Sequence, residues 1–544
     1  GEIYKFAIET EDGKILLKAD PYARLSELRP DTASIVTTAN NYKWQDKKWT
    51  NRRLQDYHKS AINIYEIHLG SWKMNGEEFL SYREIAEVLP SYLLEMNYTH
   101  VEFMPLMEHP FDKSWGYQTT GFYAPTSRYG SPDDLRYLID RLHEQNIGVI
   151  LDWVPGHFCR DDFGLASFDG QAVYEYAEGW KANNSGWGTL NFDLGRPEVK
   201  SFLIANAMYY LKEFHFDGFR VDAVSNMLYL SYGREKGEWT PNSDGTDVNK
   251  YAVEFIRELN LNVKLKHPKA IMIAEESTIW ENVSKNFEDD GLGFDFKWNM
   301  GWMNDSLKYI ETDPIYRKHE HNKLTFGMMY NHNENFILPL SHDEVVHGKK
   351  SMLDKMWGDY WNKFAGLRAY STYMIGHPGK KLIFMGMEFG QFIEWSEDKQ
   401  LDWNLPEEFE SHRKLQEYFK TINGIYKNNK SLWKYDYDAK GFEWIDADNN
   451  DESIYIFMRS AEHPKKDTLI FICNFTPNTY KEYKVGVPYN TKYKEIMNSD
   501  SEMFGGSNKL NTGIIEAKDK ASHNQKYSID ITIPPMGAVI LAIK

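Results

Sequence analysis

Hydrophobic residues in the middle of the chain form short apolar runs that alternate with amphipathic stretches of helical period. The runs lie at residues 62–69, 99–106, 147–153, 216–221, 270–274, 294–298, 335–340 and 381–385. The helical stretches lie at residues 82–96, 133–144, 197–213, 250–265, 302–309, 360–375 and 408–426. Short continuous apolar runs are typical of buried parallel strands. Eight strands that alternate with helices predict an α/β fold, a (β/α)8 TIM barrel over residues 51–430.

The two ends of the chain show a different pattern. Residues 1–50 contain two short strands around Asp12-Gly13 and predict a partial N-terminal β module. After residue 430 the helical period stops, and alternating runs at 442–445, 454–459, 467–474, 527–533 and 538–543 predict a C-terminal antiparallel β-sandwich over residues 431–544. The connection at 154–196 is too long for a plain loop, so we expect an inserted subdomain there. The chain opens at Gly1 without a methionine, so we expect its natural start to lie upstream.

Composition argues against several classes of protein. A net charge of −17 disfavours nucleic acid as a partner, and no apolar stretch approaches the roughly 20 residues that span a membrane. The only cysteines, Cys159 and Cys473, are far apart, which favours a reducing cytoplasm over a disulfide framework or a zinc–thiolate site. Aromatic residues make up 15% of the chain. Most should fill the core, but those in polar, glycine-rich loops also suit stacking against sugar rings.

Polar side chains gather where the predicted strands end. They are Asp152 and His157 after the third strand, Arg220 and Asp222 after the fourth, Glu275 and Glu276 after the fifth, His342 and Asp343 after the seventh, and Tyr117 in the loop after the second. The carboxyl ends of barrel strands share one rim, so we expect these side chains to converge. Alternation along a strand puts Arg220 on the same side as Asp222, and a guanidinium there would keep that carboxylate ionised. An isolated pair of this kind is more often structural, but the acids at the other strand ends favour a site.

Several carboxylates beside histidines and an arginine suit the chemistry of acetals. One carboxylate attacks the anomeric carbon and a second carboxyl group protonates the departing oxygen. A metal site is the alternative explanation, but the sequence has no HExxH motif and no compact aspartate-rich loop, so we expect neither a metal nor another cofactor. Alternation along the strand does not choose between Glu275 and Glu276.

Four motifs resemble, in the same order, the four sequence regions of the α-amylase superfamily, glycoside hydrolase family 13. They read DWVPGHF, GFRVDAV, AEEST and LSHDEVVHG. The phrases YEIHLGSW, WGYQTTG, KWNMGWM and HGKKSM narrow the resemblance to the 1,4-α-glucan (glycogen) branching enzymes, over nearly the whole chain. In this family a proline usually follows the pair that is Lys355-Met356 here, where Trp357 stands instead. Residues 1–50 resemble only the end of the family's N-terminal carbohydrate-binding module.

The resemblance implies a catalytic role for three acids. Asp222 would be the nucleophile, Glu275 the acid/base, and Asp343 the stabiliser of the transition state. The substrate-binding positions it implies are Arg220, which would orient the nucleophile, His157 and His342, which would bond the sugar, Tyr117, which would stack on it, and Asp152, which would support it.

The implied reaction is cleavage of an α-1,4 glucan with retention and transfer of the segment to a 6-hydroxyl, which makes the α-1,6 branches of glycogen. The expected partner is an α-glucan, with no nucleic acid and no membrane, and we expect a cytoplasmic monomer. Two alternatives stay open. One is an α-glucan hydrolase of the same superfamily, either debranching or trehalose-releasing. The other is a non-catalytic glycan-binding protein, which would have lost at least one of the three acids.

Overall fold

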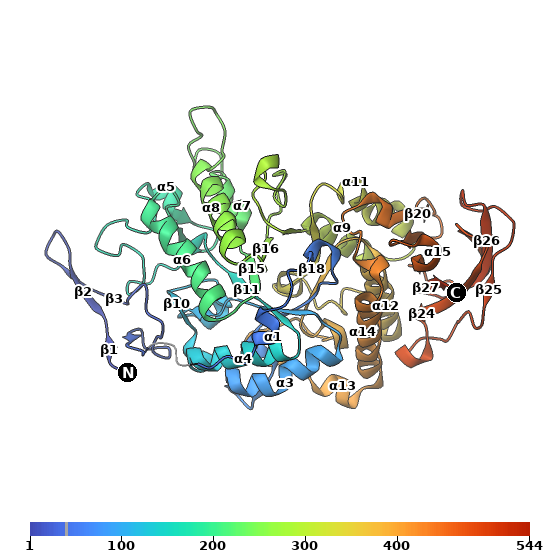
Figure 1. The fold of residues 1–544 in the computed structure, drawn as a ribbon, viewed down its shortest axis with the longest axis horizontal. Helices are drawn as coiled ribbons and strands as arrows, with labels where there is room; N and C mark the ends of the chain where they lie inside the picture. The colour runs from blue at the N-terminus through green and yellow to red at the C-terminus, as the bar shows by residue number, and fades with distance from the viewer. Residues whose placement is uncertain (39–41) are drawn as a thin grey trace.

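A closed barrel of eight parallel strands forms the centre of the molecule (Figure 1). The computed structural model describes residues 1–38 and 42–544, so residues 39–41 of the predicted N-terminal module lie outside it. Around the ring the strands are β5 (Asn63–Ile67), β8 (His100–Phe103), β11 (Gly148–Trp153), β15 (Gly218–Val221), β16 (Ile271–Ala274), β17 (Phe296–Trp298), β18 (Phe336–Leu340) and β19 (Lys380–Phe384). Each strand lies within a residue of an apolar run seen in the sequence. The predicted (β/α)8 barrel is confirmed.

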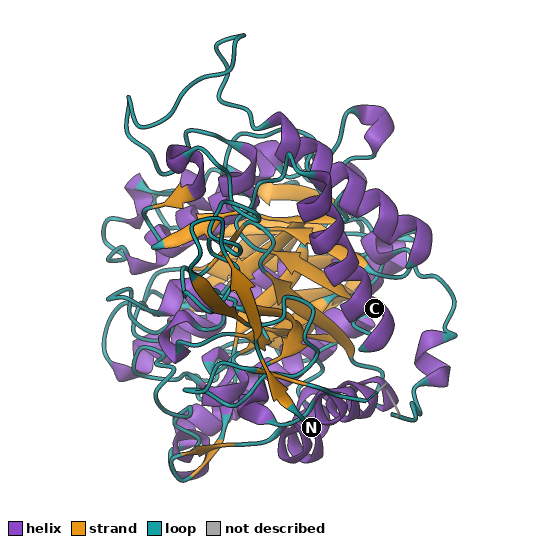
Figure 2. Cartoon of the chain, turned by 90° about the vertical axis from the view of Figure 1, so that its left-hand side faces the viewer, coloured by secondary structure: helices purple, strands orange, loops and turns teal. Residues whose placement is uncertain are grey.

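Helices enclose the strands on the outside (Figure 2). The long ones are α3 (Tyr82–Glu95), α4 (Pro132–Glu144), α6 (Pro197–Glu213), α8 (Lys250–Lys266), α9 (Met300–Glu311), α12 (Tyr360–Gly376) and α14 (Glu410–Asn428). The short ones are α1 (Lys47–Thr50), α2 (Leu69–Trp72), α5 (Gly179–Ala182), α7 (Val224–Leu228), α10 (Asn322–Thr325), α11 (Gly327–Tyr330), α13 (Asn404–Glu408) and α15 (Pro464–Asp467). Helix α4 begins with a capping box between Ser131 and Asp134 and with Pro132 at its first position, which fixes where it starts. Within the described ranges, no helix has the length and apolar character needed to cross a membrane.

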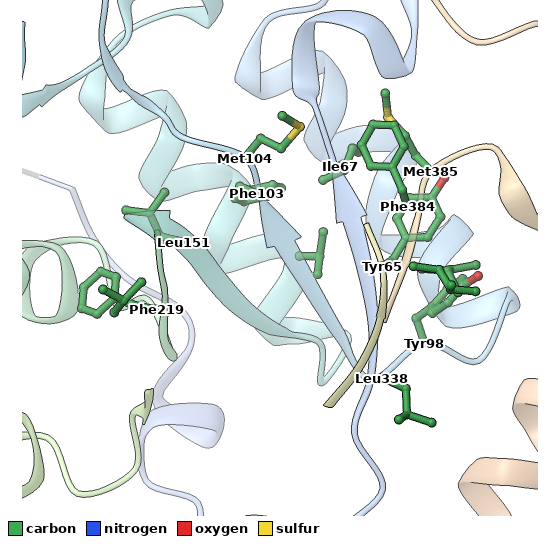
Figure 3. Packing of buried hydrophobic residues seen from close by; sticks show 14 of the residues in the cluster. Tyr65, Ile67, Tyr98, Phe103, Met104, Leu151, Phe219, Leu338, Phe384 and Met385 are labelled. Atoms are coloured by element: carbon green, nitrogen blue, oxygen red, sulfur yellow. The ribbon is translucent and has the colours of Figure 1, made fainter. Parts of the chain in front are cut away.

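Alternation along the barrel strands separates an outer core from an inner one. Ile67, Phe103, Leu151 and Phe219 form one row across four neighbouring strands and face the surrounding helices (Figure 3). The inward side chains form a second apolar cluster, made of Ile62, Ile64, Ile150, Ile271, Ile273, Phe296, Trp298, Ile337 and Leu382. Two residues further along their strands, the same inward side carries polar groups. The barrel is therefore apolar at its base and polar at the carboxyl rim.

Gly218 allows the fourth and fifth strands to approach each other closely. Its φ is 156°, and a Cβ added there would lie 2.0 Å from the carbonyl oxygen of Ile271. Only glycine fits such a position. The close pairing continues along both strands and sets Arg220 opposite Ile273.

A small β unit interrupts the barrel between β11 and α6. Its sheet contains β12 (His157–Phe158), β14 (Thr189–Asn191) and β13 (Asn183–Asn184), in that order. The N-terminal strands are β1 (Ile3–Tyr4), β2 (Phe6–Glu9), β3 (Ile15–Lys18) and β4 (Ser34–Ile35), which pair as β1 with β4 and β2 with β3. Lys18 connects the two units, because its ammonium donates to the carbonyls of Asp162 at 2.5 Å and Ala166 at 2.7 Å. Short pairs elsewhere are β6 (Met74–Asn75) with β7 (Glu78–Phe79), and β9 (Met107–Glu108) with β10 (Gly121–Pro125).

The C-terminal region forms an antiparallel β-structure of two sheets. One sheet has the order β20 (Phe442–Asp446), β21 (Ile454–Arg459), β22 (Leu469–Asn474), β27 (Gly537–Ile543), β24 (Lys492–Asn498) and β25 (Ile515–Glu516), and the other pairs β23 (Tyr480–Val487) with β26 (Tyr527–Ile533). The predicted antiparallel fold is confirmed, but the sequence pattern missed β23 and β24. Both strands carry several lysines and glutamates on exposed positions, which hide the apolar alternation.

A buried ion cluster joins the barrel to the C-terminal sheet. Asp436 lies in the connection between them and binds Lys380 of β19 at 2.9 Å and Arg459 of β21 at 2.8 Å, with all three side chains 0% exposed. Burial opposes the ionisation of Asp436, but Lys380 and Arg459 outweigh burial and lower the pKa of Asp436 to about 2. One carboxylate thus satisfies a buried cation from each unit.

Replacing Asp436 with Asn should lower the free energy of unfolding by about 3–5 kcal/mol, because two buried cations lose their counter-charge. Since the pKa of Asp436 is lowered on folding, its contribution is present above about pH 4 and is lost as the pH falls toward 2. Denaturant unfolding at pH 7 and pH 3 measures both effects. Glu462→Gln removes a carboxylate that pairs with Lys434 at the surface, and it should leave the midpoint unchanged. Equal midpoints for Asp436→Asn and the wild-type protein would show that the cluster does not hold the two units together.

Candidate active site

A pocket of about 400 Å³ opens at the carboxyl ends of the barrel strands. Among the residues that line it are seven expected from the sequence: Tyr117, His157, Arg220, Asp222, Glu275, His342 and Asp343. The eighth, Asp152, is fully buried and bonds to Arg220 and Tyr117. Side chains far apart in the chain thus meet at one end of the barrel.

Arg220 is the centre of this arrangement. Its buried guanidinium lies over the ring of Trp298, 4.5 Å from the centroid, at the top of the inner apolar cluster. Nη1 donates to Asp152 at 2.7 Å and to Asp222 at 2.9 Å, and Nη2 lies 3.0 Å from Glu275. Asp222 and Glu275 therefore contact the two terminal nitrogens of one guanidinium, which holds both carboxyl groups at the same point of the pocket.

The structure separates Glu275 from its neighbour Glu276. Glu275 faces the pocket, and its Oε2 accepts a 2.7 Å hydrogen bond from the backbone N–H of Ala223. Ala223 has a left-handed φ of 49°, and this turn aims its N–H at Glu275 directly after Asp222 in the chain. Glu276 is buried on the other side, with its carboxylate 2.6 Å from the Lys297 ammonium. Of the two acids, only Glu275 lines the pocket.

Burial and the repulsion between carboxylates raise the proton affinity of two of the acids near Arg220, Asp222 and Asp152. Burial raises the pKa of Asp222 well above its usual range, Arg220 lowers it, and Glu275, Asp152 and Asp343 raise it again. Burial also raises the pKa of Asp152 to about 6, against the effect of Arg220. One guanidinium does not neutralise three carboxylates, so the free site retains protons that exposed acids would have lost.

Asp343 follows β18 and lies next to His342. The Asp343 side chain is 42% exposed, and its Oδ1 lies 3.4 Å from Nε2 of His342. Partial burial opposes ionisation of Asp343, but His342 and Arg220 outweigh it and lower the pKa of this acid. Burial lowers the pKa of His342, but Asp343 and Glu66 raise it to about 9. This side of the pocket therefore holds an ionised carboxylate against a protonated imidazole at neutral pH.

Aromatic rings and a second histidine complete the pocket wall. Tyr117 donates its hydroxyl hydrogen to Asp152 at 2.5 Å, and its ring stacks on that of His342. Burial lowers the pKa of His157 to about 4, so this ring is neutral at pH 7. Trp187, which is 42% exposed, packs against His157 from the inserted unit.

Sequence reasoning assigned no role to several side chains of the lining: Trp115, Trp187, Tyr232, Met300 and His347. Trp187 had a usable signal, because it stands between two glycines in a polar loop. Met300 stands inside the phrase KWNMGWM, but neither it nor Tyr232 carries a group that pointed to chemistry, and only the folded barrel brings them to the pocket.

The arrangement suits acid–base and nucleophilic chemistry on a sugar. In the part of the chain that the structure describes, no three histidine, cysteine, aspartate or glutamate side chains are grouped so that they could hold a metal ion. The acids instead contact Arg220 and His342. Two carboxyl groups on one side and an ionised carboxylate on the other could surround a single anomeric centre.

Two family models match parts of this chain. Residues 80–172 match the family "Alpha amylase, catalytic domain", and residues 444–544 match "Alpha amylase, C-terminal all-beta domain". Among solved structures, a putative alpha amylase from Salmonella typhimurium has a TM-score of 0.70 at 16% identity, covering 98% of this chain and 89% of that one. A pullulanase from Anoxybacillus sp. LM18-11 has a TM-score of 0.70 at 17% identity, covering 98% of this chain and 77% of that one. At such identities the likeness concerns the fold alone.

Closer relatives narrow the family. The 1,4-alpha-glucan branching enzyme GlgB 1 of Clostridium perfringens (strain 13 / Type A) is 60% identical over 539 residues, which cover 99% of this chain and 80% of the relative. The 1,4-alpha-glucan branching enzyme GlgB of Francisella philomiragia is 56% identical over 546 residues, which cover 100% of this chain and 85% of the relative. With identity at this level over almost its full length, the chain belongs to the family of 1,4-alpha-glucan branching enzymes.

Proposed function

We propose that this chain is a 1,4-α-glucan branching enzyme that cleaves an α-1,4-linked glucan with retention and transfers the released segment to a glucan 6-hydroxyl. The observation that carries the proposal is the meeting of Asp222, Glu275 and Asp343 around one pocket, with the first two on a single guanidinium. Family membership supports the choice of glucan as substrate.

In the first step Asp222 attacks the anomeric carbon of the donor chain. The bond from that carbon to the departing O4 breaks, and Glu275, as the carboxylic acid, gives its proton to O4. The products are a covalent glycosyl ester on Asp222 and a shortened glucan with a new 4-hydroxyl. Arg220 orients both reacting groups, because it contacts the two at once.

In the second step a 6-hydroxyl of an acceptor glucan attacks the same carbon. Glu275 is now a carboxylate and takes the hydroxyl proton, while the ester bond to Asp222 breaks. Two inversions leave the configuration of the anomeric carbon unchanged, and the new bond is α-1,6. The ionised Asp343 stabilises the positive charge that develops on the sugar in each step.

The wall of the pocket gives substrate and acceptor their positions. Tyr117 offers an aromatic ring and His157 a neutral imidazole to the sugar in the cleaved-bond subsite, whereas Asp152 acts from below through Arg220 and Tyr117. Apolar contacts come from Trp187, which is partly exposed at the rim. A transferase must hold an acceptor hydroxyl near the ester more often than water reaches it, and such surfaces favour a sugar over water.

The same proposal places the protein, as a monomer, in a reducing compartment such as the cytoplasm. The cysteines bear on the compartment. Both cysteines, Cys159 and Cys473, are buried free thiols. Burial raises the pKa of each thiol above its usual range, which keeps both protonated and unreactive.

Incubation with amylose should reduce the iodine colour without a matching rise in reducing ends, because each transfer removes one α-1,4 bond and forms one α-1,6 bond. Treatment of the product with a debranching enzyme should then release short chains that can be sized. An equal rise in reducing ends would favour the hydrolase alternative, and an unchanged iodine colour would favour a non-catalytic glycan-binding protein.

Asp222→Asn and Glu275→Gln should each lower the branching rate by about 10³-fold or more, since each removes a group that reacts in both steps. Glu281 lies in the same loop as Glu275 but is exposed and outside the pocket. The control variant Glu281→Gln should therefore retain the wild-type rate. Far-UV circular dichroism and thermal unfolding check that the variants fold. Folded Asp222→Asn with near-normal activity would exclude Asp222 as the nucleophile.

Arg220→Lys should lower kcat/KM by about 10²-fold or more, because one ammonium cannot replace the planar guanidinium that contacts three acids. Arg220 lowers the pKa of Asp222, and an ammonium that reaches fewer of the three carboxylates should lower it less, so the pKa of Asp222 should rise. Asp222 must be ionised to attack, and the acidic limb of the activity profile should therefore move to higher pH. The dependence of kcat/KM on pH measures the shift, and an unmoved limb would contradict the assigned electrostatic role.

A further inference from the structure

The imidazole of His342 lies between two carboxylates. Its Nδ1 is 2.5 Å from Oε1 of Glu66, and its Nε2 is 3.4 Å from Oδ1 of Asp343. Oε2 of Glu66 also accepts the backbone N–H of His342, at 2.9 Å. Glu66 is completely buried on β5, the first barrel strand, and His342 follows β18, the seventh.

A count of hydrogens determines the protonation state that fits this geometry. A neutral imidazole has one N–H and would turn the lone pair of its other nitrogen toward a carboxylate. Tyr117, 3.2 Å from Nε2, already donates its single hydroxyl hydrogen to Asp152, so toward His342 it can only accept. Both ring nitrogens of His342 thus face acceptors, and the imidazolium, which has two N–H groups, is the form that satisfies them.

We infer that Glu66 is a positioning residue for catalysis: it holds His342 as an imidazolium, with Nε2 lying 3.4 Å from Oδ1 of Asp343. The inference goes beyond the three acids and rests on the proposed function only where activity is the readout. Glu66 itself touches neither substrate nor reacting atoms, because it lies behind His342 and outside the pocket lining.

Other charged groups around His342 fit this assignment. Asp343 and Glu66 raise the pKa of His342, whereas burial and Arg220 lower it, and the balance is a pKa of about 9. His68, at the end of the same strand as Glu66, is neutral because burial lowers its pKa to about 3. Glu102 of β8 stands beside Glu66 in the same layer of the barrel, and burial raises the pKa of its carboxyl group. Asp152 lies further away and is itself held by Arg220.

The imidazolium gives the pocket a buried cation in addition to Arg220. It keeps Asp343 ionised while positive charge develops on the sugar. When substrate fills the pocket, the Nε2–H group of His342 can instead donate a hydrogen bond to a sugar hydroxyl. Loss of the Glu66 charge would release this proton near neutral pH. The effect should appear in the pH dependence of catalysis and leave the fold intact.

Glu66→Gln tests the inference with almost no change in shape. The amide has only one oxygen to accept the two N–H groups that Glu66 accepts, so its NH2 group must face one of them, which favours a neutral His342 with its proton on Nε2. The descending alkaline limb of kcat/KM should move to lower pH by one unit or more, with about a 10-fold loss at pH 8. A profile that only scales down, with its limb unmoved, would overturn the inference.

Glu102→Gln is the matched control. Glu102 stands opposite Glu66 in the barrel register and is equally buried, but neither of its carboxyl oxygens has a hydrogen-bond partner among the described residues, so an amide of nearly the same size leaves the hydrogen bonds of His342 in place. Its pH profile should coincide with that of the wild-type protein. An identical limb shift in both variants would mean that any change in this layer of the barrel disturbs the site, and the specific role of Glu66 would be rejected.

A spectroscopic measurement separates this inference from the proposed reaction. In protein with isotope-labelled histidines, assigned through His342→Gln, the His342 ring should give imidazolium shifts at pH 7.5 in the wild-type protein and neutral shifts in Glu66→Gln. A neutral His342 in the wild-type protein would overturn the inference even if branching is observed. A chain that fails to branch glucan but shows the imidazolium would refute the proposed function alone.

Discussion

The contact of one buried guanidinium with three carboxylates is the interaction on which the rest of this structure depends. Arg220 would be very unfavourable inside a barrel without Asp152, Asp222 and Glu275, and these acids would be equally unfavourable together without Arg220. The ring of Trp298 supplies the platform beneath the cation. The same contact therefore fixes geometry and charge, and it orients the carboxyl groups of Asp222 and Glu275, which are the groups proposed to react.

The barrel makes this arrangement possible because alternation along its strands sorts side chains by depth. Ile64 and Ile150 fill the base, and Glu66 and Asp152 stand two residues further along the same strands. The polar layer has two cationic centres, Arg220 at strands three to five and the His342 imidazolium between strands seven and one. Each cation faces acids from more than one strand, so closure of the barrel is needed to assemble either centre.

The sequence predicted the parts of this structure that depend on local pattern. Continuous apolar runs located the barrel strands, and strand ends located the acids. Strand alternation left Glu275 and Glu276 open, and only the family resemblance chose Glu275; in the structure the backbone N–H of Ala223 binds Glu275 at the pocket. Glu66 is an acid inside the apolar run 62–69, which is a signal that the sequence analysis did not use. Its partner His342 lies 276 residues away, so the pattern around Glu66 alone could not identify it. Strand β23 was missed because exposed lysines and glutamates interrupt its alternation.

The pocket has two parts: charged groups around Arg220 and His342, and a wall that includes the aromatic rings of Tyr117 and Trp187. This division explains why fold alone does not determine the reaction. A putative alpha amylase and a pullulanase share this fold at 16–17% identity, so the barrel alone does not identify the reaction of this chain. In the proposed mechanism, a glycosyl ester on Asp222 could be attacked by water or by a sugar hydroxyl, with Glu275 as the base in both cases. Selection between them therefore falls to the wall. Trp187 comes from the inserted unit and Met300 from the start of α9, and such loop and helix-end positions can change without disturbing the charges below.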